Sequence, residues 1–128
     1  LPLAVERVNA GAVEHLAAFA EEMRGYREEE ERRGAELAES LGVGRFALPV
    51  EMGREALAGL SLRDRALLIR ELARRLKLPV LSRARCLELA RLLDGRKGFR
   101  FFWGGGVTVR GGSSLVSWER QPDGAVPF

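Results

Sequence analysis

The stretch Ser61–Leu93, SLRDRALLIRELARRLKLPVLSRARCLELARLL, decides the fold because it predicts two amphipathic helices joined by a proline turn. Ser61 stands where an N-cap is expected, and Asp64 places a carboxylate at the positive end of the first helix dipole. Pro79 ends that helix, and Ser82 is predicted to cap the second. Apolar residues recur at steps of three and four, which predicts one buried stripe on each helix. The stripes are Leu62, Ala66, Ile69, Leu72, Ala73 and Leu76, then Cys86, Leu89, Ala90 and Leu93.

Before this stretch, the sequence predicts one long helix over residues 10–41. An apolar seam follows the 4-3-4-3 spacing of a coiled coil over two heptads. Its members are Ala12, Leu16, Phe19, Met23 and Tyr26. Glu30 and Arg33 interrupt the seam, which resumes at Leu37 and Leu41, and Gly25 and Gly34 are candidate bends. Two interpretations stay open for this helix: a solvated surface, or a coiled-coil contact that forms a homodimer.

The segments on either side of the helix pair have weaker signals. Gly42 to Gly44 breaks the long helix, Arg45–Val50 is an apolar connector, and Glu51–Leu60 is predicted to form a short helix. Gly95 is predicted to end the second helix of the pair in a left-handed conformation.

From Phe99 onward the apolar period changes to two, which predicts three short strands. Gly104–Gly106 and Gly111–Ser114 are the turns between them, with glycines supplying positive φ. The predicted fold is therefore α+β: a long connecting helix over 1–42, and a compact domain over 43–128. That domain combines a bundle of short amphipathic helices with a small antiparallel three-stranded meander.

Positive charge is unevenly distributed along the chain, whose formal net charge is +3. Residues 1–42 carry 5 basic and 10 acidic side chains, residues 43–98 carry 13 and 6, and residues 99–128 carry 3 and 2. The middle segment therefore predicts an anionic partner.

Ten basic residues form the candidate nucleic-acid site, because guanidinium groups bind phosphate bidentately and several together give salt-dependent affinity. They are Arg74, Arg75, Lys77, Arg83 and Arg85 around the proline turn, and Arg91, Arg96, Lys97, Arg100 and Arg110 farther along. Exposed Phe or Trp side chains on the strands could stack on unpaired bases. An ordinary arginine-rich surface is the other interpretation.

Composition disfavours several other functions. Cys86 and His15 are the only cysteine and histidine, so neither a metal cluster nor a Ser-His-Asp set can be assembled. Gly104–Gly106 does not fit a phosphate-binding loop. No run of 18 apolar residues predicts a membrane span, and a single cysteine fits a cytoplasmic protein. The start at Leu1-Pro2, without Met, suggests a piece of a longer protein.

Several motifs, in this order, carry a family resemblance. LRDRALLIRELARRL spans Leu62–Leu76, Ser82–Arg85 opens the next helix, LLDGRKG spans Leu92–Gly98, and FRFFWGGGVTVRGGSSLVSW spans Phe99–Trp118. Nearly the whole chain resembles the C-terminal, substrate-binding region of bacterial tRNA(Ile)-lysidine synthetase. An aromatic residue that usually follows the equivalent of Arg110 is absent, which leaves any specific role of that turn open.

The resemblance implies a non-catalytic role for this chain. The family attaches lysine to the wobble cytidine of an isoleucine tRNA, with ATP and Mg in an N-terminal domain marked by an SGGxDS motif, which this chain lacks. The resemblance therefore implies tRNA and that catalytic domain as partners, and no cofactor in this chain. The alternative is a structural or dimerisation module that docks the catalytic domain without touching nucleic acid.

Overall fold

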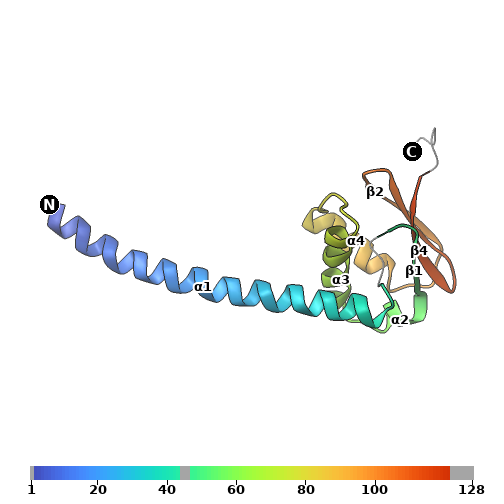
Figure 1. Ribbon diagram of the computed structural model, residues 1–128, viewed down its shortest axis with the longest axis horizontal. Helices are drawn as coiled ribbons and strands as arrows, with labels where there is room; N and C mark the ends of the chain where they lie inside the picture. Colours follow the sequence, from blue (N-terminus) through green and yellow to red (C-terminus); the bar gives the residue numbers. More distant parts are fainter. Residues whose placement is uncertain (1, 44–46, 122–128) are drawn as a thin grey trace. The chain divides into compact units, whose positions relative to one another are not determined.

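The computed structural model describes residues 2–43 and 47–121, with side chains from residue 12 onward (Figure 1). The chain divides into two compact units, residues 1–32 and residues 33–128. The predicted α+β class is confirmed, with four strands where three were expected. The elements are α1 (Pro2–Ser40), β1 (Val50–Gly53), α2 (Arg54–Ala58), α3 (Leu62–Arg75), α4 (Arg83–Leu92), β2 (Phe99–Gly104), β3 (Val107–Gly111) and β4 (Leu115–Arg120).

Helix α1 begins earlier than the sequence predicted, at Pro2 instead of near residue 10. Proline is well tolerated at the first position of a helix, and one internal glycine costs only about 1 kcal/mol, so Gly11 does not stop it. The predicted stop at Gly42 is confirmed. Gly42 has a φ of 83°, and the next N–H, from Val43, donates to the carbonyl oxygen of Ala38 at 2.9 Å.

Gly34 is where the last turns of α1 approach α3 most closely. A Cβ at this position would lie 2.9 Å from the carbonyl oxygen of Leu67 and 3.2 Å from the Cβ of Glu71. The absence of a side chain therefore lets the two helix backbones pack against each other inside the 33–128 unit.

Both serine caps of the helix pair are confirmed. The Oγ of Ser61 accepts from the N–H of Asp64 at 3.1 Å, and the Oγ of Ser82 accepts from the N–H of Arg85 at 3.3 Å. The predicted stripe of α4 is buried throughout. Helix α3 buries more than its predicted stripe, because Leu67 and Leu68 are also buried, whereas Leu62 is 38% exposed.

Lysine, and not glycine, takes the left-handed position in the helix pair. Lys77 has a φ of 54° just after α3, and Leu78 N–H donates to Ala73 O at 2.9 Å, as in a Schellman motif. The prediction for Gly95 is wrong, because the left-handed glycines among the described residues do not include it. Helix α4 instead ends with Leu93 in a right-handed conformation.

The sheet has the strand order β1-β4-β3-β2, and all neighbours are antiparallel. Strand β1 contradicts the predicted helix over 51–60, of which only α2 is helical. Val50 and Met52 are buried and pair with Trp118 and Val116, while Glu51 points to the exposed side. A short edge strand that runs directly into a helix gives too few residues for its alternation to stand out.

The two predicted glycine turns differ in their physical basis. Gly104, Gly105 and Gly106 all have positive φ, as expected for a hairpin turn. Gly111 does not, so that part of the prediction is wrong. Gly111 is required for space, because a Cβ at this position would overlap the ring of Phe99.

Helices α3 and α4 lie on one side of the sheet, and the hydrophobic core is formed between these helices and the sheet (Figure 1). Trp103 and Trp118, at 2% and 0% exposure, are part of this core. The Nε1 of Trp103 donates to the carbonyl oxygen of Pro79 at 2.7 Å, which fixes the proline turn against β2. Neither tryptophan is therefore available to stack on a base, and among the aromatic residues of β2 only Phe99 and Phe102 are partly exposed.

Candidate nucleic-acid interface

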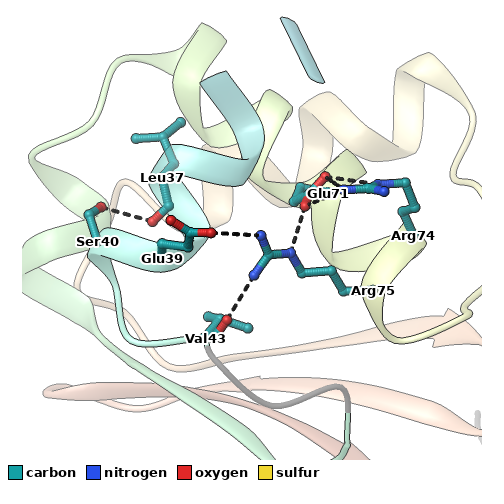
Figure 2. A network of polar contacts seen from close by, with 7 residues as sticks. All are labelled: Leu37, Glu39, Ser40, Val43, Glu71, Arg74 and Arg75. Carbon is teal, nitrogen blue, oxygen red and sulfur yellow. Dashed lines mark hydrogen bonds and ion pairs between the residues drawn. The ribbon is translucent and has the colours of Figure 1, made fainter. Parts of the chain in front are cut away.

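Arg74 and Arg75, two of the ten predicted cations, are engaged inside the 33–128 unit. Both bind Glu71, a buried carboxylate at 4% exposure, with nitrogen–oxygen distances of 2.7 Å for Arg74 and 2.6 Å for Arg75 (Figure 2). Burial alone would raise the pKa of Glu71, but the hydrogen bonds and charges of the two arginines outweigh it, so the pKa lies below its usual value.

Arg75 joins α3 to the end of α1. Its Nη1 donates to the carbonyl oxygen of Val43 at 2.9 Å, and its Nη2 lies 3.9 Å from a carboxylate oxygen of Glu39 (Figure 2). The side chain is only 11% exposed. Arg75 therefore links α3 to the end of α1, whereas Arg74 keeps 66% of its side chain exposed.

Arg85 is also part of the fold. Its guanidinium donates to the carbonyl oxygens of Phe102 and of Trp103, the latter at 3.3 Å, and lies 4.6 Å from the ring centroid of Phe101. It thus fastens the start of α4 to β2. Reversing the charge of Arg75 or Arg85 would therefore test folding and not binding.

Seven of the ten predicted residues have exposed side chains, and no ion pair or side-chain hydrogen bond within the described part of the chain engages them. They are Lys77, Arg83, Arg91, Arg96, Lys97, Arg100 and Arg110. Guanidinium and ammonium groups in this state can bind anions without first breaking an internal contact.

These seven residues do not form one continuous surface. Lys77 and Arg83 flank the proline turn, which lies against the β2–β3 turn, where a Cβ on Gly105 would be 3.0 Å from the Cδ of Pro79. The other five lie in the last turn of α4 or in the segments after it. A helix of 10 residues separates the two ends by about 15 Å.

Arg100 and Arg110 come together on the uncovered side of the sheet. They are direct cross-strand partners on β2 and β3, and both are exposed. The next pair on the same side is Phe102 and Thr108, with Phe102 half-buried. We call the side of the β2–β3 hairpin that carries Arg100, Phe102, Thr108 and Arg110 the open hairpin face.

Acidic residues occupy the other half of the same side of the sheet. Glu119 is the partner of Thr108 and accepts a hydrogen bond from Ser117 at 2.9 Å, and Glu51 on β1 pairs with Ser117. The uncovered side is therefore positive along β2 and β3 and negative along β4 and β1. A bound polyanion would be directed along the hairpin edge.

Arg54 is a buried arginine next to the candidate site that no sequence pattern marked. It is 2% exposed, and its guanidinium donates to the carbonyl oxygens of Gly95, of Leu92 at 2.8 Å and of Gly112 at 3.0 Å. Its guanidinium carbon also lies 4.9 Å from the centroid of the Phe99 ring. Burial lowers the pKa of this guanidinium.

The contacts of Arg54 position the backbone that carries the candidate site. Its carbonyl partners lie just before Arg96 and Lys97 and just after Arg110. Arg65, 6% exposed, similarly joins the start of α3 to the end of α4 through Ala90 O at 2.6 Å and Asp94 at 3.3 Å. No local sequence signal distinguishes these two arginines from the exposed ones. Gly111, which leaves room for Arg54, is the nearest to such a signal.

Comparisons with protein-family models, with curated proteins and with solved structures find no match to this chain. Among the helices that the structure describes, none is long and apolar enough to cross a bilayer.

Proposed function

We propose that the 33–128 unit is a non-catalytic accessory domain that holds tRNA through its phosphate backbone. The observation that carries this proposal is the cross-strand pair Arg100 and Arg110. Like charges directly opposite each other destabilise a sheet, and here no acidic partner among the described residues offsets them. A phosphate bound between the two guanidinium groups would remove that repulsion.

Phe102 is the reason to favour RNA over other polyanions. It lies one pair along from the two arginines on the open hairpin face and is half-buried, so its ring is held in place while part of it stays accessible. An unpaired base stacks well on such a ring while the neighbouring phosphates meet cations.

The identity of the RNA rests on the sequence resemblance. By that resemblance, the chain helps position an isoleucine tRNA while a separate catalytic domain, using ATP and Mg, attaches lysine to the wobble cytidine. In this proposal the chain contributes substrate binding, its partners are tRNA and the catalytic domain, and no residue here contacts ATP.

Fluorescence anisotropy with labelled tRNA tests the proposal at several salt concentrations. The double variant Arg100→Ala/Arg110→Ala should weaken binding at low salt and reduce the slope of log K against log salt by about 1.5, because two phosphate contacts are lost. Arg63→Ala/Arg24→Ala is a matched control, since both of these arginines are exposed and neither is one of the four residues that define the open hairpin face.

Equal affinity and slope for the double variant and the wild-type chain would contradict the assignment of this surface. A folded wild-type chain that binds no tRNA at low salt would contradict the function itself. That result would favour the structural role, in which the chain only attaches to other parts of the enzyme.

A further inference from the structure

The exposed apolar stripe on α1 has no counterpart elsewhere in the described chain. Every described residue from 12 to 29 is exposed, including large apolar side chains that face one side of the helix. These are Val13, Leu16, Phe19, Met23 and Tyr26, at 62%, 66%, 60%, 44% and 58% exposure. A contiguous apolar stripe of this kind on a solvated helix marks an interaction surface.

The spacing assigns each member of the stripe to a coiled-coil position. Leu16 and Met23 fall at a, Phe19 and Tyr26 at d, and Val13 beside the seam at e. The next d position is Arg33, whose Nη2 binds Asp64 at 2.9 Å, and the following a position is Leu37, buried at 4% in the chain's own core. Leu37 therefore buries the seam in the chain's own core, whereas Arg33 and the apolar seam residues from 16 to 26 are exposed.

We propose that a second copy of this chain covers the stripe, forming a parallel two-stranded coiled coil over residues 12–29. Glu22 falls at g and Arg27 at the following e, so a parallel partner places each Glu22 beside the other chain's Arg27, twice by symmetry. An antiparallel partner in the register that aligns the apolar layers would place Glu22 near its own copy and Arg27 beside Val13. Charge complementarity therefore selects the parallel pair.

The length of the stripe limits the strength of the dimer. Residues 12–29 form eighteen helical residues that span about 27 Å. This is fewer than three heptads, and a sequence pattern indicates a stable coiled coil only from three or four heptads. The interface is consequently at the small end of specific protein contacts. We expect reversible association in the micromolar range. This inference is independent of tRNA binding.

Sedimentation equilibrium of the full chain over a wide concentration range tests association. Leu16→Lys should raise the dimer dissociation constant at least about tenfold, since it replaces an apolar seam side chain in both copies with a charged one. Val80→Lys is the matched control, because Val80 is 84% exposed and lies outside α1. Circular dichroism checks that both variants stay folded. A wild-type chain that is monomeric at every concentration, or equal dissociation constants for Leu16→Lys and wild type, would overturn the proposal.

Two further variants test the orientation. Arg27→Glu should weaken the dimer because it faces Glu22 of the second copy, and Glu22→Arg/Arg27→Glu should restore it. In a separate experiment, Ala12→Cys should form an interchain disulfide, because identical d positions adjoin in a parallel pair. Gly25→Cys, at the outward c position, should not. Undiminished association of Arg27→Glu would overturn the parallel arrangement.

Discussion

Replacing Arg54 with methionine tests whether a buried arginine that bonds to main-chain oxygens holds the sheet to the helices. Methionine has a similar length, so the substitution removes the guanidinium with little loss of apolar packing. The carbonyl oxygens of Leu92, Gly95 and Gly112 each lose their donor, and the ring of Phe99 loses its cation.

The magnitude follows from these contacts. Each hydrogen bond from a charged donor contributes about 1.5–3 kcal/mol, and removing the buried charge returns part of that through its desolvation. We expect the free energy of unfolding to fall by about 3 kcal/mol. That is a large fraction of the stability of a domain of this size.

Urea unfolding followed by tryptophan fluorescence measures the effect, since Trp103 and Trp118 are both in the core. Arg63→Met is the control: Arg63 is exposed, and its replacement should change stability by less than about 0.5 kcal/mol. If Arg54→Met unfolds at the same urea concentration as wild type, with an unchanged slope, the three carbonyl contacts contribute nothing and the reasoning is refuted.

Three other substitutions have expected outcomes that follow from single contacts. Lys77→Gly should raise the free energy of unfolding by about 0.5–1 kcal/mol in urea titrations, because glycine adopts the left-handed φ of 54° without strain, and Lys77→Ala should give no such gain. Gly111→Ala should lower it by about 1–3 kcal/mol or more, because the new methyl group overlaps the ring of Phe99; an unchanged unfolding midpoint would show that the ring moves freely. The lowered pKa of Glu71 makes its contribution complete above its ordinary pKa of 4.5 and lost as the pH falls through the folded-state value. Glu71→Gln should therefore be less stable than wild type near neutral pH and lose less stability on acidification, and parallel curves of unfolding midpoint against pH would contradict this.

The parts of the fold that the sequence predicted are those set by local chemistry. Serine hydroxyls at Ser61 and Ser82 cap helices wherever an apolar-periodic run follows, and glycines at 104–106 form the turn because few other residues adopt positive φ. Strand β1 was missed because its four residues are paired only with β4, far along the chain. Pairing between segments so far apart in the chain produces no pattern within the sequence of β1 itself.

The sequence predicted which basic residues belong to the candidate site, but not which of them are exposed on the same surface. Charge counting treats Arg75, Arg85 and Arg100 alike, yet two of them bond to carbonyl or carboxylate groups that only the folded chain brings near. Arg54 was omitted for the same reason. Whether an arginine is exposed depends on which carbonyl oxygens are left without partners at helix ends and turns, and that is decided by tertiary packing.

The carbonyl contacts of Arg54 have an electrostatic consequence. Main-chain oxygens satisfy the hydrogen bonds of the guanidinium without neutralising it, and within the described chain no carboxylate pairs with it. Its charge therefore remains beneath the segment that carries Arg96 and Lys97. Mobile ions screen exposed charges within about 10 Å at 0.1 M salt but screen buried ones much less. Part of the attraction of this surface for an anion should consequently persist at salt concentrations that suppress the contribution of the exposed arginines.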